Sequence, residues 1–545
     1  MRPKRPLSAR FFERMPQGVY ECILQQLETA HFGDSSNTNC GTCYIKDLCN
    51  LAVTSKSWAK PVKNRMYQKL WVTADTGHHS TKRARYGTAE KLRLLLRTLK
   101  QNPAIARIVK ELQVSDWLQV YEFANVEERN DIVEYLSAIV MACTNLEKLI
   151  GFYTVYNHDM DSLTQALSTR TRLKERLWII RDDRTITRRS LRLDDEDDYA
   201  RPDYAKSFLN RHVNWASLET LVLFGHDGST GMDYRAFVGT FRKLQCLKRL
   251  CIATFPAEEF NDRTLQAIPE LHSLRLQSLP GVSDKGLTKF FGTEAAASLR
   301  GLSLIDLEIT SLTVLAKMFN SLIRLRKFTL SQDSSPSLPP GAILPHPFLA
   351  SESLQELHWD TLVPGEAIND LASCIDSDAF PALRQIRAPT DYSGTLQDLC
   401  RPVAQMVHDS DTHLVNLLNA SAVSDTHYTR NLPEARRAAQ MRLEEARKKP
   451  SLKIIIEEEG MIQNVYTMRA FMGNLSSKIE YSLEPDVENS NEAIIGLADL
   501  IYKKGEDGRE NMCTGPVNER EAEGKRVWNH RPRRRGKSLE VKQLF

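Results

Sequence analysis

A leucine pattern that returns along the middle of the chain constrains the fold more than any other feature of this sequence. The pattern Leu-x-x-Leu-x-Leu, or a close variant of it, returns at intervals of 29, 24, 28, 26, 29 and 29 residues. The copies begin at Leu218, Leu247, Leu271, Leu299, Leu325, Leu354 and Leu383. A single copy arises easily by chance, whereas so many copies at so steady a spacing indicate an internal repeat.

Each copy predicts a short strand whose alternating apolar residues face a core, followed by a helix that covers it. Helical patterns do lie between copies, as at 283–291 and 310–319. One such unit cannot bury its apolar face alone, so neighbouring units must stack. The period matches that of leucine-rich repeats, about 20–29 residues. We therefore expect an α/β chain with an irregular leucine-rich-repeat solenoid over residues 85–400.

Two earlier units are expected upstream of the regular copies. Their strands are predicted at 109–114 and 146–150, and their helices at 92–99 and 132–141. The segment 173–215 matches no copy.

Two polar stretches predict loops on this solenoid. The acidic run at 194–198 is interpreted as part of a solvated insertion, in preference to an acidic recognition patch. The Pro- and Ser-rich stretch 332–347 predicts a loop on one rim.

The first seventy residues predict a cluster of short helices. Val19, Ile23 and Leu27 recur every four residues and form one apolar stripe, and Pro16 suits a first helical turn, where its missing N–H costs nothing. Further helices are predicted at 45–58 and 62–71, the first of them after a polar loop. Short helices bury little surface by themselves, so such a cluster needs a partner or a neighbouring domain.

These residues resemble the F-box, particularly its fungal form. Its pattern is a Leu-Pro pair, an Ile-Leu helix, a helix that ends in Val-Ser/Cys-Lys/Arg-x-Trp, and a closing Leu-Trp. Met15-Pro16, Ile23-Leu24, the segment 48–58 and 70–71 correspond to it. The sequence departs from it in Met15, where Leu is usual, and in a longer loop over about 32–44. With the repeats, the resemblance extends to F-box/leucine-rich-repeat-like proteins and predicts an F-box at 10–72.

The resemblance implies that the F-box binds the Skp-type adaptor, which joins it to the cullin core of an SCF ubiquitin ligase. The solenoid would then present a protein target, and the chain itself would not be an enzyme. The adaptor-binding residues so implied are Met15, Pro16, Ile23, Leu24, Leu27, Leu48, Leu51, Val53, Ser55 and Trp58. Some of them must pack the F-box itself, and the sequence does not separate the two roles. The alternative is a repeat scaffold with an F-box-like cap that joins no ligase.

The C-terminal part predicts a cap and a tail. A helix at 432–449 and a β-hairpin over 451–468 form a predicted cap, 401–485, that closes the open end of the solenoid. A disordered basic tail, 503–545, contains the cluster 531–537. That cluster is compatible with a nuclear-import signal or a merely solvated tail. Nucleic-acid binding is less favoured, because Trp528 is the lone aromatic residue near it.

Composition excludes several other classes of protein. The formal net charge of +4 over 545 residues does not mark a nucleic-acid binder. No apolar run approaches the roughly 20 residues that span a bilayer, and the basic start of the chain is not followed by the apolar run of a secretory signal. A cytoplasmic or nuclear protein is therefore expected, with its 10 cysteines as free thiols.

No metal, cofactor or catalytic motif emerges from the sequence. Cys40 and Cys43 have the spacing of half a zinc site, but no second pair follows at a suitable distance. The glycine-rich stretch 225–231 lacks the Lys-Ser/Thr ending of a phosphate-binding loop, so a loop between repeats is predicted there.

Overall fold

The computed structural model describes residues 16–32, 41–73, 82–181, 204–401, 452–468, 474–481 and 541–545, apart from short gaps within these ranges. Its main feature is a ten-stranded, entirely parallel sheet in the order β15-β12-β11-β10-β9-β8-β7-β6-β5-β4. The strands are β4 (Val155–Tyr156), β5 (Glu175–Ile180), β6 (Thr220–Gly225), β7 (Arg249–Ala253), β8 (Ser273–Gln277), β9 (Gly301–Ile305), β10 (Lys327–Gln332), β11 (Glu356–Thr361), β12 (Gln385–Arg387) and β15 (Glu480–Tyr481).

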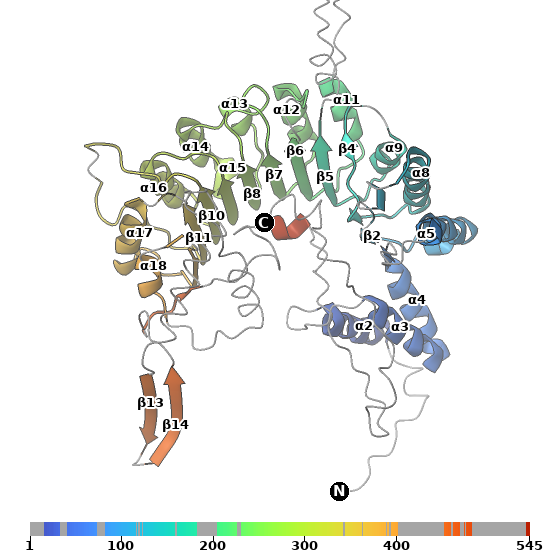
Figure 1. Cartoon of the computed structure of the whole chain (residues 1–545), viewed down its shortest axis with the longest axis horizontal. Helices are drawn as coiled ribbons and strands as arrows, with labels where there is room; N and C mark the ends of the chain where they lie inside the picture. Colours follow the sequence, from blue (N-terminus) through green and yellow to red (C-terminus); the bar gives the residue numbers. More distant parts are fainter. Residues whose placement is uncertain are drawn as a thin grey trace, which may run out of the picture.

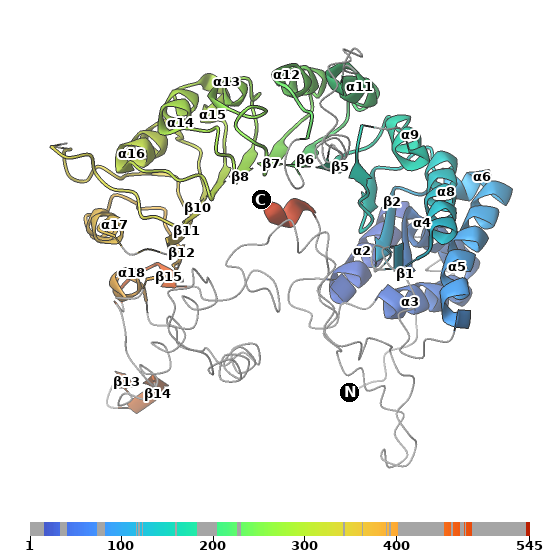
Figure 2. The ribbon, with the colours of Figure 1, turned by 45° about the horizontal axis from the view of Figure 1, so that its top comes forward.

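One face of this curved sheet is covered by helices, and we call the opposite face the inner face (Figures 1 and 2). The covering helices are α9 (Ser162–Ser168), α11 (Tyr204–Arg211), α12 (Tyr234–Lys243), α13 (Asp262–Leu265), α14 (Asp284–Phe291), α15 (Glu294–Ala297), α16 (Leu312–Ser321), α17 (Ala367–Asp376) and α18 (Thr395–Asp398). Asp or Ser side chains start several of them by accepting backbone N–H bonds, as Asp233 does at α12 and Ser283 at α14.

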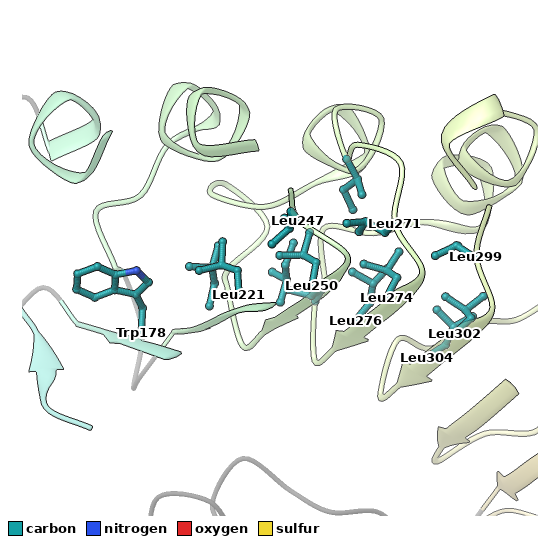
Figure 3. Close-up of a cluster of buried hydrophobic side chains, with 14 of the residues drawn as sticks. Trp178, Leu221, Leu247, Leu250, Leu271, Leu274, Leu276, Leu299, Leu302 and Leu304 are labelled. Carbon is teal, nitrogen blue, oxygen red and sulfur yellow. The ribbon is translucent and has the colours of Figure 1, made fainter. Parts of the chain in front are cut away.

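The predicted leucines form rows between the sheet and the helices. Leu221, Leu250, Leu274 and Leu302 lie in register on neighbouring strands, and each is almost fully buried. Figure 3 shows these side chains stacked from strand to strand on the helical side of the sheet. All seven predicted repeat strands are present. In each copy the apolar residues alternate with a period of two, so they all lie on one face of the strand, and that face must be buried.

A second sheet of three parallel strands precedes the large one. It contains β1 (Lys69–Thr73), β2 (Glu111–Ser115) and β3 (Lys148–Ile150), packed against α5 (Lys82–Gln101), α6 (Pro103–Ala106) and α8 (Val126–Ala142). The two earlier units predicted from the sequence are therefore present. Between β3 and β4 the strand breaks at Gly151, whose φ of 86° is readily adopted only by glycine.

The segment 173–215, which matched no copy of the pattern, contains a further unit. β5 and α11 form its strand and helix, and Leu173 begins it in the usual way. Arg176 stands in register with Leu221, so an arginine fills the position that a leucine fills in the next unit. This exchange hides the repeat from a search for leucines. The acidic run at 194–198 lies outside the described residues.

Three helices precede the sheets: α2 (Gln17–Phe32), α3 (Gly41–Thr54) and α4 (Lys56–Gln68). Two predicted boundaries were wrong. Ser55, in extended conformation, separates α3 from α4, whereas a break at Pro61 was expected. Residues 70–71 belong to strand β1, where pairing with β2 and the strand-favouring Trp71 and Val72 outweigh the predicted helix.

The C-terminal part differs from its prediction in two places. β13 (Leu452–Glu458) and β14 (Met461–Met468) form the predicted antiparallel hairpin, but Figure 1 draws it away from the sheet, and β15 instead extends the sheet. The Tyr481 hydroxyl donates to the Ala388 carbonyl oxygen there. Residues 541–544 form a short 3₁₀-helix, η1 (Val541–Leu544), where a disordered tail was expected. The predicted helix 432–449 and the basic cluster 531–537 lie outside the described residues.

Candidate docking surfaces

The three N-terminal helices enclose a small core of their own, and we call this unit the helical module. Its buried apolar side chains are Tyr20, Leu24, Tyr44, Leu48, Trp58 and Val62. The Tyr20 and Trp58 rings meet edge to face, with 4.6 Å between their centres. Burial raises the pKa of the Tyr44 hydroxyl, an effect that Arg65 partly offsets. This core holds the helices in one arrangement despite their small size.

A histidine–carboxylate contact and an ion pair reinforce the helical module from its edges. His31 of α2 lies 2.9 Å from the Asp47 carboxylate of α3, and Arg65 of α4 contacts Glu28 of α2. Both pairs are partly exposed, so each stabilises the module by about 1 kcal/mol at most.

The structure separates the predicted adaptor-binding residues into two groups. Leu24, Leu48 and Trp58 are interior side chains of the module, with 2%, 0% and 6% of their surface exposed. Leu27, Leu51 and Ser55 are half-buried, while Pro16, Ile23 and Val53 are exposed. Met15 lies outside the described residues. Ile23 is 40% exposed and Val53 84%, so these two apolar side chains are available to a partner.

Val19 adds to this exposed apolar surface. It lies one helical turn before Ile23 on α2 and is 39% exposed. Residues four apart share a helix face, so the predicted stripe of Val19, Ile23 and Leu27 is only partly used by the core of the module. Unpartnered apolar side chains at such spacing are typical of a helix that docks on another protein.

The helical module is joined firmly to the three-stranded sheet. The last turn of α4 runs straight into β1, in which Trp71 packs against the core of the module and Val72 against the core of the sheet. The buried Trp117 indole N–H donates to the Val72 carbonyl oxygen at 3.0 Å. A partner bound to the helical module would therefore be held in a defined orientation relative to the repeats.

The inner face of the large sheet changes character along its length. On β5, β6 and β7 it carries an apolar cluster that we call the inner patch: Leu177, Ile179, Val222, Phe224, Cys251 and Ala253. Arg275 and Ser303 continue the row of Val222 and Cys251 on the next strands. Thr329 and His358 follow on the strands after those. The inner face is therefore apolar at one end and polar at the other.

The helix η1 lies beside the inner face of the sheet (Figures 1 and 2). Its apolar side chains pack against the inner patch. Val541 is 0% exposed and Leu544 3%, and Phe545 packs beside them, half-buried. Burying such side chains stabilises the contact by about 1.5–3 kcal/mol each. The Arg275 guanidinium donates to the Leu544 carbonyl oxygen at 3.3 Å and to the Gln277 side-chain oxygen at 2.9 Å.

The cysteine of the inner patch, Cys251, is unreactive in this arrangement. Burial raises the pKa of the Cys251 thiol to about 11, and the nearby Arg275 lowers it by less. A thiol with so high a pKa is almost entirely protonated at neutral pH and is a poor nucleophile. Cys251 therefore contributes apolar surface to the inner patch.

Other sites considered from the sequence find little support in the described residues. Within the described ranges, no group of three or more His, Cys, Asp or Glu side chains is placed to hold a metal ion. Cys40 and residues 226–229 of the glycine-rich stretch lie outside those ranges. No helix in the described part of the chain is long and apolar enough to cross a bilayer.

Comparison with known proteins identifies no family for this chain. No protein-family model matches the chain, and no curated protein matches it. Among solved structures it is similar to a leucine-rich repeat-containing protein, LegL7, from Legionella pneumophila, with 15% identity and a TM-score of 0.32. That match covers 58% of this chain and 90% of the other.

Proposed function

We propose that this chain is the target-recognition subunit of an SCF-type cullin–RING ubiquitin ligase. In this proposal the helical module is an F-box that binds a Skp-type adaptor, and the repeats form a leucine-rich-repeat solenoid that binds a protein target. The observation that carries the proposal is the helical module, because it has its own core yet leaves Val19, Ile23 and Val53 exposed.

The firm junction between the helical module and the sheet supports the same role. A recognition subunit contributes no chemistry of its own, so the chain is not an enzyme in this proposal. It raises the local concentration of target lysines near the ubiquitin-conjugating enzyme. That effect requires a fixed geometry between adaptor and target, which the continuous path from α4 into β1 supports.

The test is co-purification of the full chain with a Skp-type adaptor, compared among single variants. Ile23→Asp and Val53→Asp place a charge on the exposed surface of the helical module without entering its core. Val363→Asp is the matched control, because Val363 is 57% exposed and lies near β11. Apolar anchors at an interface typically cost about 2 kcal/mol or more when removed.

We expect the wild type and Val363→Asp to retain the adaptor. We expect Ile23→Asp and Val53→Asp to lose it while keeping an unchanged circular dichroism spectrum. A wild-type chain that retains no adaptor contradicts the proposal, and the protein is then better described as a repeat scaffold that joins no ligase. Equal retention by all variants places the interface elsewhere than the helical module.

A further inference from the structure

We propose that the inner patch is the binding site for a short helical segment of a protein target, and that η1 occupies this site as a tethered competitor. The inference rests on the part of the proposed function that assigns target binding to the repeats. It does not depend on the adaptor. The starting observation is that an apolar surface on β5–β7 is covered by residues remote in sequence.

The seated segment defines the chemistry that the inner patch accepts. In a 3₁₀-helix, side chains three residues apart lie above one another, so Val541 and Leu544 project from the same side of η1. Both are buried against the patch, which is built from branched, aromatic and small apolar side chains. A target segment must therefore carry two branched apolar residues at positions i and i+3.

Arg275 adds recognition of the backbone to this apolar contact. Its guanidinium donates to the Leu544 carbonyl oxygen, which belongs to the last turn of η1. The C-terminal end of a helix presents unsatisfied carbonyl groups and partial negative charge, so a cation is favourable there. The Gln277 side chain holds Arg275 in place. The site is thus suited to the end of a short helix, with the apolar pair one turn before it.

The occupant is small enough to be exchanged. η1 has 4 residues, and its described buried side chains are two branched apolar groups followed by the half-buried Phe545. Because η1 belongs to the same chain, its local concentration at the patch does not fall on dilution, and it lowers the apparent affinity of any target for the patch. A target with the same apolar pair and one further contact displaces it.

The experiment uses the full chain and a fluorescent peptide with the sequence of residues 538–545, Ser-Leu-Glu-Val-Lys-Gln-Leu-Phe. Fluorescence polarisation measures its binding to the wild type and to a Val541→Asp/Leu544→Asp chain. In that chain the tethered segment cannot dock but the sheet is unaltered. A second peptide carries the same two aspartates. Ile323→Asp, at a site 72% exposed outside the inner patch, is the control chain.

We expect the Val541→Asp/Leu544→Asp chain to bind the first peptide at least tenfold more tightly than the wild type and Ile323→Asp chains do. We expect none of the chains to bind the aspartate peptide. Equal binding by the doubly substituted chain and the wild type overturns the proposal, since η1 then does not compete. Absence of binding to every chain also overturns it. Neither outcome bears on the adaptor, so this failure is distinguishable from failure of the ligase role.

Discussion

The guanidinium carbon of Arg176 lies 4.4 Å from the centre of the Trp178 ring, inside the row of side chains that neighbouring units fill with leucine. The aromatic face attracts the cation. However, Arg176 is only 5% exposed, and no acceptor among the described residues reaches its Nε atom. Burial lowers the pKa of Arg176 to about 10.

The substitution Arg176→Met tests whether this buried charge destabilises its unit. Methionine keeps a long side chain against Trp178 and removes the charge, so we expect the free energy of unfolding to rise by about 1 kcal/mol. Urea unfolding followed by tryptophan fluorescence measures it. Arg300→Met, at an exposed position, should change stability by less than about 0.5 kcal/mol. A marked loss of stability in Arg176→Met would instead show that the contact with the ring outweighs the cost of burial.

His212 predicts an acid-sensitive step in stability. Its Nδ1 lies 2.9 Å from the Phe208 carbonyl oxygen, and its Nε2 accepts from the Trp178 indole N–H at 3.3 Å, so the ring is held neutral. Burial lowers the pKa of His212 to about 3. The unfolded chain takes up a proton near pH 6.5, which the folded chain does not.

The contribution of His212 is therefore complete above about pH 6.5 and is lost progressively as the pH falls toward 3. Between pH 7 and pH 4.5 we expect a loss of roughly 2–3 kcal/mol from this group. His212→Gln should show a shallower decline of unfolding free energy over that range. His272→Gln, at an exposed site, should keep the wild-type slope. Parallel slopes in wild type and His212→Gln would refute the assignment.

Gln332 ties the end of strand β10 to the loop before α16. Its side-chain oxygen accepts from the Ile309 N–H at 3.0 Å, and its side-chain nitrogen donates to the Ile309 carbonyl oxygen at 2.8 Å. Removing the side chain in Gln332→Ala leaves both backbone groups of Ile309 without this partner, at a cost of about 2–3 kcal/mol. Thermal unfolding measures the change, and Gln355→Ala, at an exposed site, should be close to neutral.

Leu24 and Ile23 are adjacent in sequence but differ in role. Leu24 lies in the core of the helical module, so Leu24→Ala should destabilise the module by about 2–5 kcal/mol. Ile23→Ala should destabilise the module much less than Leu24→Ala does, because Ile23 is 40% exposed. The rate of hydrogen exchange at the α2 backbone amides measures this stability in each variant, and it should rise in Leu24→Ala alone. Fast exchange in both variants would mean that Ile23 also packs the module. Substitutions at Leu24 or Leu48 cannot test docking, since they disturb the fold first.

The repeats were predictable because their signal is local. Alternating leucines such as Leu274 and Leu276 define a strand and its buried face within a few residues. The repeat unit that contains Arg176 was not predicted, because a polar residue stands where the pattern requires a leucine. The break at Ser55 was missed because Pro61, which the structure places inside α4, is the stronger local signal for a helix boundary.

The candidate docking sites were less predictable than the repeats. Alternation does predict that Val222 and Cys251 face away from the helices. It gives no sign that η1 covers them, because the bond between Arg275 and Leu544 spans 269 residues of sequence. The adaptor-binding set was predicted as one group, and only the packing of three helices separates its interior members from its exposed ones.

The interruption at Gly151 has a mechanical consequence. The three-stranded sheet ends with β3 and the ten-stranded sheet begins with β4, so the strand ladder is broken at that point. The Lys174 N–H still donates to the Glu147 carbonyl oxygen at 2.8 Å across the break, and Lys148 of β3 pairs with Glu175 of β5. The buried core also continues past this point without interruption, from Val72 to Tyr481. A force applied to the helical module is therefore transmitted to the large sheet through this core, and the module keeps its orientation relative to the inner patch.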